Sequence, residues 1–312
     1  MGSLYAAAPF CLYLNIISRS KVSFCLANYF SISRTSGKIP LSPYPFKGGI
    51  RMKNIVITGG SSGIGLEIAK LIAPKAETIV LVARNPQKLA AACQQLHAIN
   101  PQLNTCSISA DLGKTEAIEQ LIQDLNNLAL EYDTLINNVG YGLNGLADSL
   151  SPKEVEKCVT TNALAPVIIT QNLLPTIVKM KGNILFIGAG AATHPMPGLV
   201  HYSASKNLIH GLVRGLRVDL KGTGVHITEI QPGPVATQFG AQSEATATSF
   251  STRNPLKKVE ISAQECAKQS LKALKANKAL LYSGWKYRFI IRLTKCIPSP
   301  IMEHILQRFV TR

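Results

Sequence analysis

The sequence lacks several patterns that would place it in particular classes of protein. None of its seven cysteines form a Cys-x-x-Cys pair, and no cysteine and histidine residues have the spacing of a zinc site. This pattern indicates reduced thiols in a cytosolic compartment rather than a disulfide framework, and no metal site is expected. No apolar run reaches the length of about 20 residues that a transmembrane helix needs. No repeat and no internal linker follows residue 52, which predicts a single domain.

Acidic residues are scarce, mainly at the two ends of the chain. The whole chain has 33 Lys and Arg residues against 17 Asp and Glu, a formal net charge of +16. Residues 1–51 contain six basic residues and no acidic one, and residues 268–312 contain ten basic residues and one acidic residue, Glu303. The middle is therefore close to neutral, which argues against a nucleic-acid partner and for a neutral core with two basic ends.

Residues 1–51 do not resemble part of a packed domain. A short apolar stretch, Leu4–Ile17, lacks the preceding positive charge of a secretory signal, and a proline- and glycine-containing stretch leads up to Met52. Three interpretations stay open: a peptide that targets an organelle, a disordered tail, or residues translated from a start upstream of Met52. We favour the last interpretation, because Met52 directly precedes the first expected core strand.

From residue 52 to residue 283, short β-type runs alternate with helical stretches. Strands are expected at 55–58, 78–83, 105–109, 134–137, 183–187, 225–230 and 280–283, and helices after residue 65 and at 86–99, 115–130, 152–180, 203–220 and 263–276. Repeated β-α units with apolar strands predict a parallel sheet that helices cover on both faces. We therefore predict an α/β fold, a single doubly wound Rossmann-type domain with a seven-stranded parallel sheet. Ligands would bind beyond the carboxyl ends of its strands.

A glycine-rich turn follows the first expected strand and opens a helix. It reads Thr58-Gly59-Gly60-Ser61-Ser62-Gly63-Ile64-Gly65. Backbone N–H groups at the start of such a helix point outward and can bind a phosphate. Glycines suit the turn because a Cβ atom would block the approach of a pyrophosphate to the backbone. The turn alone is equally compatible with a purely structural role.

Residues after the second and third strands indicate which nucleotide would bind. An acidic residue after the second strand would contact the ribose 2′-hydroxyl of NAD, whereas an arginine suits the 2′-phosphate of NADP. Arg84 occupies this position and indicates NADP(H), unless it is only a solvated surface residue. Asp111 follows the third strand, where its carboxylate could contact the adenine or cap the helix that begins near Thr115.

Tyr202 and Lys206 are four residues apart and share one face of an expected helix. A free tyrosine has a pKa of about 10, too high for proton exchange at neutral pH. A neighbouring ammonium would lower this pKa and turn the phenol into an acid/base for interconverting a carbonyl and an alcohol. Asn162 stands inside an expected helix, where asparagine is unfavourable, which indicates a structural or chemical purpose. Asn138 can bridge neighbouring strands beside Gly140.

Taken together, these motifs resemble the short-chain dehydrogenase/reductase family over about residues 53–283. They are Thr58-Gly59-x-x-x-Gly63-x-Gly65, Asp111, Asn137-Asn138-x-Gly140, Asn162, Tyr202-Ser203-Ala204-Ser205-Lys206 and Pro232-Gly233-x-x-x-Thr237. The resemblance implies an NADP(H)-dependent reductase of a small-molecule ketone, in which Tyr202 protonates the carbonyl oxygen. Lys206 would hold the nicotinamide ribose and Asn162 would anchor a water. The implied cofactor contacts are Thr58, Gly59, Ser61, Ser62, Gly63, Ile64, Gly65, Arg84, Asp111, Leu112, Asn138, Gly140, Tyr202, Lys206, Pro232, Gly233, Val235 and Thr237.

One catalytic position departs from the family pattern. The family has a serine thirteen residues before the tyrosine, and this chain has Ala189 there. That serine would hydrogen-bond the substrate carbonyl, and losing such a donor costs about 2.7–4 kcal/mol. Thr193, a water or a substrate group would have to replace the hydroxyl. Otherwise the chain is a catalytically impaired, nucleotide-binding regulatory protein. We favour activity because the other motifs survive, with Gln231 in place of the family's asparagine as a milder departure.

The last third of the sequence bears on the substrate and on partners. Residues 238–260 are polar, and the family resemblance implies that they form the mobile substrate loop, whose length predicts a lid. The tail, residues 284–312, mixes basic, aromatic and apolar residues. It would lie in a membrane interface, or else pack over the substrate pocket or against a subunit. The tail, Arg84 and the Thr58–Gly65 turn together resemble membrane-associated keto-lipid reductases such as 3-ketodihydrosphingosine reductase, which implies a lipid-like ketone. The family resemblance is also compatible with a homodimer or homotetramer.

Overall fold

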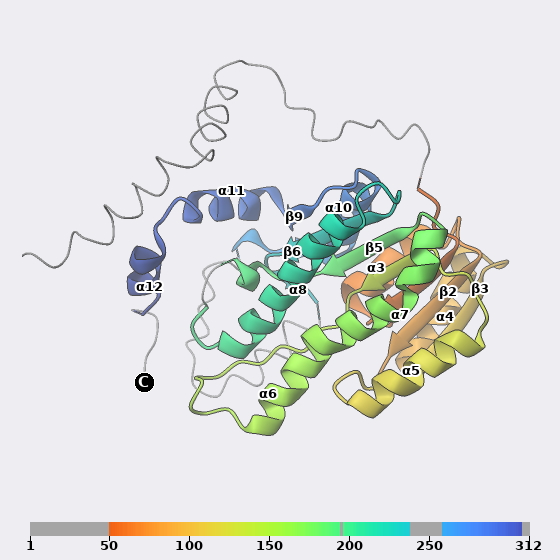
Figure 1. Cartoon of the computed structure of the whole chain (residues 1–312), viewed down its shortest axis with the longest axis horizontal. Helices are drawn as coiled ribbons and strands as arrows, with labels where there is room; N and C mark the ends of the chain where they lie inside the picture. Colours follow the sequence, from red (N-terminus) through yellow and green to blue (C-terminus); the bar gives the residue numbers. More distant parts are fainter. Residues whose placement is uncertain (1–49, 194–195, 238–257, 308–312) are drawn as a thin grey trace, which may run out of the picture. The chain divides into compact units, whose positions relative to one another are not determined.

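The computed structural model describes residues 50–193, 196–237 and 258–307. The extension at 1–49, the last five residues of the tail and residues 238–257 of the expected lid lie outside these ranges. The described residues form one compact unit, shown in Figure 1. Its strands and helices follow one another in this order: β1 (Asn54–Thr58), α3 (Gly63–Ile72), β2 (Thr78–Ala83), α4 (Pro86–Ile99), β3 (Asn104–Ser109), α5 (Thr115–Asn127), β4 (Thr134–Asn137), α6 (Pro152–Val159), η1 (Thr160–Leu164), α7 (Ala165–Lys179), β5 (Asn183–Ile187), η2 (Gly190–Ala192), α8 (Val200–Asp219), β6 (His226–Pro232), β7 (Val235–Ala236), β8 (Ile261–Ser262), α10 (Ala263–Lys275), β9 (Leu280–Ser283), α11 (Trp285–Thr294) and α12 (Ser299–Gln307).

Seven strands form one parallel sheet in the order β3-β2-β1-β4-β5-β6-β9. This confirms the predicted Rossmann-type fold. Strands β1 to β3 are added toward one edge of the sheet, and strands β4 to β9 toward the other edge. The strand order therefore reverses between β1 and β4, although all the strands stay parallel. Ligands of such sheets bind beyond the carboxyl ends of the strands at that point. A second, two-stranded sheet pairs β7 with β8 beside β6.

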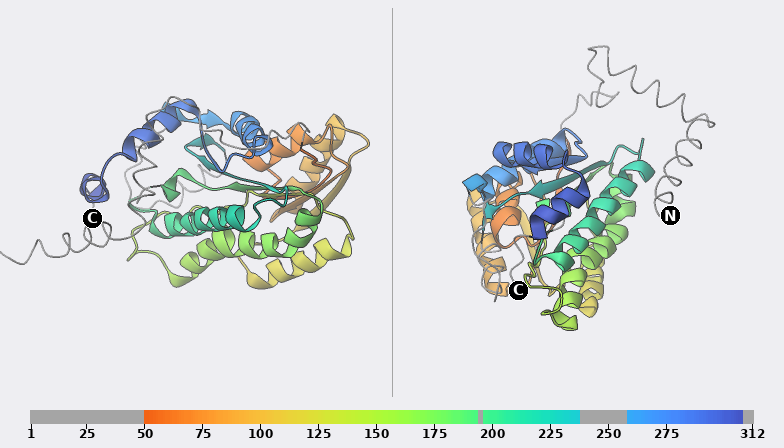
Figure 2. Two further views of the ribbon diagram at one scale, coloured as in Figure 1. Left: turned by 45° about the horizontal axis from the view of Figure 1, so that its top comes forward. Right: turned by 90° about the vertical axis from the view of Figure 1, so that its left-hand side faces the viewer.

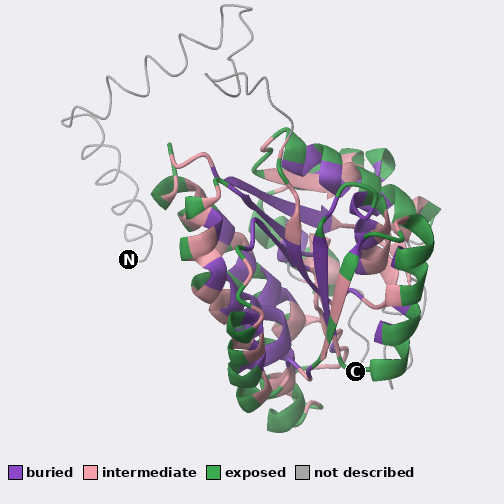
Figure 3. Cartoon of the chain, turned by 90° about the vertical axis from the view of Figure 1, so that its right-hand side faces the viewer, coloured by how far each residue is buried: buried purple, intermediate pink, exposed green. Residues whose placement is uncertain are grey.

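Helices cover both faces of the sheet, as the left view in Figure 2 shows. Alternate residues of each strand point to opposite faces. In β1, Ile55 and Ile57 pack against α3, α4 and α10, whereas Val56 packs on the side of α5, α7 and α8. All three are fully buried, and the central strands form the buried centre of the molecule in Figure 3. The near-continuous apolar strands of the sequence therefore reflect burial on two faces.

Buried polar groups bind the amino ends of the central strands to one another. The Asp133 carboxylate accepts hydrogen bonds from the Lys53 backbone N–H at 2.9 and 3.1 Å and from the Thr134 hydroxyl at 2.9 Å. Asn183 Nδ2 donates to the carbonyl oxygen of Arg51 at 2.6 Å and to Thr134 Oγ1 at 3.1 Å. These contacts link the segment before β1 to β4 and β5 in one alignment.

The expected helix at 152–180 is interrupted by a turn of π-helix, η1, between α6 and α7. Pro166 has no N–H and cannot donate to the carbonyl of Asn162 four residues earlier, so the regular α-helical bond is missing there. Pro175, in contrast, lies inside α7 without ending it. The other expected elements occur within a few residues of their predicted bounds.

The described part of the tail forms two short helices, α11 and α12. Gly284 precedes α11 with a φ of +83°, a conformation that favours glycine. Tyr287 and Ile291 on the inner face of α11 are buried, while Trp285 and Phe289 are exposed. No helix within the described ranges is long and apolar enough to cross a membrane.

Candidate active site

The glycine turn after β1 is attached to the end of β4 by side-chain hydrogen bonds. Thr58 Oγ1 accepts from the backbone N–H groups of Asn138 and Val139 at 3.1 and 3.2 Å. Asn138 Nδ2 donates to the carbonyl oxygens of Thr58 and Gly59 at 3.2 and 2.9 Å. Asn138 therefore bridges the two strands as the sequence indicated, and it fixes the turn at the carboxyl edge where the sheet reverses direction.

Packing within the protein explains two of the turn's glycines. An ideal Cβ on Gly65 would lie 2.4 Å from the Gly59 carbonyl oxygen, and one on Gly59 would lie 2.8 Å from Asn138 Nδ2. Gly63 differs, because its Cβ would meet only Thr237 at 3.4 Å, although its φ of +56° also favours glycine. Gly59 and Gly65 are therefore already required by contacts within the protein, and the expectation that the turn's glycines make room for a pyrophosphate stays a prediction.

The first turn of α3 offers backbone N–H groups to an anion. Ser62 is the N-cap residue and makes no side-chain capping hydrogen bond, and the first turn holds no acidic residue. Ser61, Ser62 and Ile64 are half-buried, so the turn is reachable from outside. The positive end of the helix dipole and these N–H groups suit a phosphate. Thr237, directly after β7, lies beside Gly63 and borders the turn there.

Residues after β2 and β3 line the neighbouring part of the same edge. Arg84 follows β2 and is exposed. The Asp111 carboxylate accepts the backbone N–H of Gly113 at 3.2 Å, and the N-cap of α5 is Lys114. The alternative interpretation of Asp111 as the cap of α5 is therefore wrong. Leu112 is buried against the core on the α5 side.

Asn162 lies in η1 and is fully buried. Its Oδ1 accepts the backbone N–H of Tyr141 at 2.7 Å, and its Nδ2 donates to the Tyr141 carbonyl at 2.9 Å and to Ser205 Oγ at 3.1 Å. The side chain thus joins the loop after β4 to α8. Its backbone carbonyl lacks an α-helical donor because residue 166 is proline.

Tyr202 and Lys206 lie on the same face of α8, next to the end of β5. Lys206 Nζ is 6.0 Å from the centre of the Tyr202 ring and donates to the Ile187 carbonyl at 3.3 Å. Burial lowers the pKa of Lys206 to about 8. The phenol of Tyr202 has a raised pKa, because protein surrounds it although part of the residue stays exposed, and Cys158 and Tyr287 add to this effect. In this arrangement burial, and not Lys206, sets the direction of the Tyr202 pKa.

Ala189, in the position of the expected serine, is buried just before η2. Thr193 does not replace it, because its hydroxyl lies 3.0 Å from Gln231 Oε1 and 3.2 Å from the Tyr282 hydroxyl. Gln231 Nε2 in turn donates to Glu229 Oε1 at 2.7 Å. The departure at Gln231 therefore belongs to a buried network that engages Thr193.

Tyr287 of α11 enters the same region, although no motif assigned it. An ideal Cβ on Gly190 would lie 1.5 Å from the Tyr287 hydroxyl oxygen, and one on Gly233 would lie 2.6 to 2.9 Å from three carbons of its ring. The ring therefore lies against the turn of the Pro232-Gly233 motif, with its hydroxyl over the residue that follows Ala189. The sequence signal was present: Tyr287 and Ile291 are four residues apart and share the buried face of α11.

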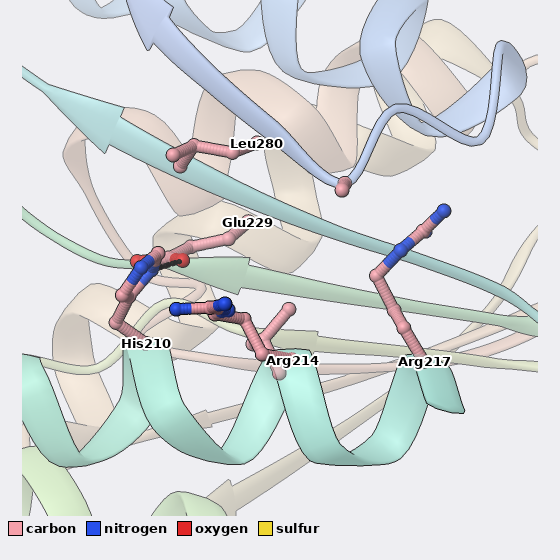
Figure 4. Close-up of a pocket in the computed structure, with 7 residues that line it drawn as sticks. His210, Arg214, Arg217, Glu229 and Leu280 are labelled. Atoms are coloured by element: carbon pink, nitrogen blue, oxygen red, sulfur yellow. Dashed lines mark hydrogen bonds and ion pairs between the residues drawn. The ribbon is translucent and has the colours of Figure 1, made fainter. Parts of the chain in front are cut away.

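A separate cavity of about 250 Å³ lies between α8 and the β6–β9 edge of the sheet. His210, Val213, Arg214, Arg217, Glu229, Ala279 and Leu280 line it. Figure 4 shows His210 directed at Glu229, and His210 Nδ1 lies 2.6 Å from Glu229 Oε2. No residue predicted from the sequence as part of the site lines this cavity. Glu229 connects it to the network of Gln231 and Thr193.

Comparisons of the sequence with known proteins agree with one family. Residues 53–248 match the profile described as short chain dehydrogenase. The chain is 32% identical over 185 residues to a ketoacyl reductase, HetN, from Nostoc sp., across 59% of this chain and 64% of that relative. It is 30% identical over 209 residues to a serine 3-dehydrogenase from Agrobacterium fabrum, across 65% of this chain and 82% of that relative. The match to HetN thus spans less than two thirds of that relative's length.

Solved structures share the fold. A short-chain dehydrogenase from Sphingobium yanoikuyae in complex with NADPH has a TM-score of 0.65 at 23% identity, and the match covers 74% of this chain and 87% of that one. An actinorhodin polyketide ketoreductase with NADPH has a TM-score of 0.64 at 22% identity, and the match covers 74% of this chain and 95% of that one. At these identities the likeness shows the fold alone.

Proposed function

This chain belongs to the short-chain dehydrogenase family of NAD(P)-dependent oxidoreductases, and from that premise we propose that it reduces an apolar ketone to an alcohol with NADPH. The observation that carries the proposal is the position of Tyr202, Lys206 and Asn162. All three lie at the carboxyl edge of the sheet, on the side of the β1–α3 turn, where such a sheet binds its ligand.

The residues at this edge fit a dinucleotide. The uncapped first turn of α3 would hold the pyrophosphate through the backbone around Ser61, Ser62 and Ile64. Asp111 and Leu112 would flank the adenine, and Gly140 would leave room for the nucleotide beside Asn138. At the other end, Lys206 would hold the nicotinamide ribose. The turn Pro232–Val235 and Thr237 would border the nicotinamide, since Thr237 already lies beside Gly63.

Arg84 favours NADPH over NADH. It is exposed, directly after β2, and no acidic residue takes the place that would contact a ribose 2′-hydroxyl. A guanidinium can bind a phosphate with two parallel hydrogen bonds, which an unphosphorylated ribose cannot offer. We therefore assign Arg84 to the 2′-phosphate.

The chain's own contribution to the reaction is a proton and a fixed geometry. When bound, the reduced nicotinamide supplies a hydride to the carbonyl carbon. Tyr202 gives its proton to the carbonyl oxygen, so the ketone gains one hydride and one proton and becomes a secondary alcohol. Water then reprotonates the tyrosinate. Although burial raises the pKa of Tyr202, its phenol is still a stronger acid than the secondary alcohol that forms, so the phenol can protonate the oxygen as the hydride arrives. Asn162 would anchor a water of the relay.

The outer surface of the tail supports an apolar, lipid-like substrate at a membrane surface. Trp285, Phe289 and Leu293 are four residues apart on α11 and are 72%, 60% and 55% exposed. Lys286, Arg292 and Lys295 are exposed beside them. An apolar stripe with flanking cations suits the interface of an anionic bilayer. Among the relatives, HetN is described as a ketoacyl reductase, which is the same class of carbonyl.

Turnover tests the proposed reaction. The full chain should oxidise NADPH in the presence of 3-oxoacyl thioesters or 3-ketodihydrosphingosine. The Tyr202→Phe variant should lose this activity but still bind NADPH, as a change in NADPH fluorescence would show. Binding of NADPH without turnover on any ketone would favour the second candidate function, a nucleotide-binding regulatory protein. The specific observation that favours this alternative is Ala189 in place of the serine.

Vesicle flotation tests the membrane surface. The triple variant Trp285→Ser, Phe289→Ser and Leu293→Ser should lose flotation with phosphatidylserine-containing vesicles, whereas the wild type should float. Substitution is better than deletion of the tail, because deletion would also remove Tyr287. Equal flotation of both proteins would contradict the assignment, and vesicles of phosphatidylcholine alone separate the apolar contribution from the charged one.

A further inference from the structure

The position of Tyr287 matches the one chemical defect of the site. The family's serine would present a hydroxyl to the substrate carbonyl from position 189, and Ala189 has none. The Tyr287 hydroxyl oxygen lies over Gly190, the next residue, at 1.5 Å from the place that a Cβ atom would occupy. The Tyr287 phenol therefore packs against the backbone segment from which the serine hydroxyl is missing.

The surrounding residues are shaped to admit this ring. Any side chain at Gly190 would overlap the hydroxyl, and any side chain at Gly233 would lie within 2.6 to 2.9 Å of the ring carbons. Steric repulsion keeps a Cβ atom at least about 3 Å from atoms to which it is not bonded. Both positions must therefore be glycine for the Tyr287 ring to lie where it does. Gly284, with a positive φ, turns the chain into α11 so that its third residue faces inward.

We propose that Tyr287 donates the hydrogen bond to the substrate carbonyl oxygen that Ala189 cannot supply. The inference rests on the proposed ketone reduction. In this arrangement two phenols share the work: Tyr202 transfers its proton to the oxygen, and Tyr287 keeps its proton and stabilises the negative charge that develops there. Burial, with Tyr282 nearby, raises the pKa of Tyr287, so its hydroxyl remains a donor at neutral pH. Tyr287 is thus a catalytic residue supplied by the tail.

Kinetics of single-atom variants test the assignment. Tyr287→Phe removes one oxygen and leaves the ring, so we expect kcat on the 3-oxoacyl thioester to fall on the order of 10²-fold. Tyr132→Phe is the matched control: Tyr132 is buried to a similar extent, its hydroxyl donates to the Leu125 carbonyl at 2.8 Å, and it lies away from the site. It should leave kcat within about twofold. Adding Ala189→Ser to Tyr287→Phe should restore most of the lost rate.

A spectroscopic arm does not depend on turnover. In a Tyr202→Phe background, which cannot transfer the proton, the ketone C=O stretch of a bound 3-oxoacyl thioester is measured with NADPH present. Tyr287 as donor shifts this stretch to lower frequency, so the double variant Tyr202→Phe/Tyr287→Phe should show a higher frequency. Equal frequencies would overturn the inference. So would an unchanged or increased kcat in Tyr287→Phe, the latter showing that the ring only blocks the substrate.

The two proposals fail in different ways. Loss of activity in Tyr202→Phe with full activity in Tyr287→Phe would overturn the role of Tyr287 and leave the ketone reduction standing. Turnover that appears only after Ala189→Ser would show that Tyr287 does not replace the serine, and this also overturns the inference. No turnover in any variant, with equal carbonyl frequencies, would count against both proposals.

Discussion

Lys206 should make the free energy of unfolding depend on pH in a way that identifies it. Its side chain is 4% exposed, and burial lowers its pKa to about 8 from an ordinary value of 10.5. The unfolded chain therefore binds more protons at this residue between these two values, and stability rises as the pH increases through that window. Below pH 8 the folded protein holds a buried ammonium. Each unit by which burial lowers the pKa corresponds to a cost of about 1.4 kcal/mol.

The size of the effect follows from the two pKa values. Between pH 6.5 and pH 10, Lys206 should contribute a rise of about 2.5 kcal/mol to the free energy of unfolding. Lys206→Met keeps a long side chain without the charge. The free energy of unfolding of the wild type should therefore rise by this amount relative to that of the variant between pH 6.5 and pH 10. The lost hydrogen bond to the Ile187 carbonyl adds only an offset that does not depend on pH.

Urea unfolding of both proteins without nucleotide, at several pH values, measures the difference directly. Taking the difference between wild type and variant removes the contribution of the other lysines and tyrosines, since both chains share them. A difference that stays constant from pH 6.5 to pH 10 would refute the argument, because it would mean that Lys206 titrates in the folded protein as it does in the unfolded chain.

Two further predictions concern the nucleotide and the buried network. Arg84→Ser should weaken NADPH binding about 10- to 100-fold and leave NADH binding unchanged, because a charged hydrogen bond contributes about 1.5–3 kcal/mol. Fluorescence titration measures both affinities, and Arg214→Ser, at another exposed arginine, is the control. Gln231→Leu should lower the free energy of unfolding by about 2 kcal/mol, because Glu229 and Thr193 lose a buried hydrogen-bond partner, and an unchanged urea midpoint would contradict this.

The fold was predictable from the sequence because hydrophobic burial dictates it. The apolar runs at 55–58, 78–83 and 134–137 are strands buried on both faces, and the parallel order of the sheet follows from the helices between them. Family motifs likewise located the edge of the sheet where Thr58 and Asn138 meet. These features depend on local sequence pattern, which a single chain displays directly.

The remaining features depend on contacts between distant parts of the chain. Tyr287 is 97 residues from Gly190 in the sequence, so its entry into the site has no local pattern beyond a buried helical face. The pKa of Tyr202 was expected to fall on the basis of its neighbour at position 206, whereas the surrounding protein raises it. Asp111 was considered as a helix cap, but the helix begins at Thr115 with Lys114 as its N-cap, and the Asp111 carboxylate accepts the backbone N–H of Gly113 instead.

The bonds between Thr58 and Asn138 have a consequence for judging whether a chain of this kind is active. If a strand that is apolar on both faces shifts its register by one residue, its apolar side chains only change faces and both faces stay apolar. Hydrophobicity alone therefore does not define which residues of neighbouring strands pair. The polar bonds of Asp133 at one end of β1 and of Thr58 at the other define them. Selection for correct folding would therefore preserve the glycine turn and Asn138 even in a chain that had lost its chemistry. If the proposed mechanism holds, the phenols of Tyr202 and Tyr287 are the better markers of a working catalyst.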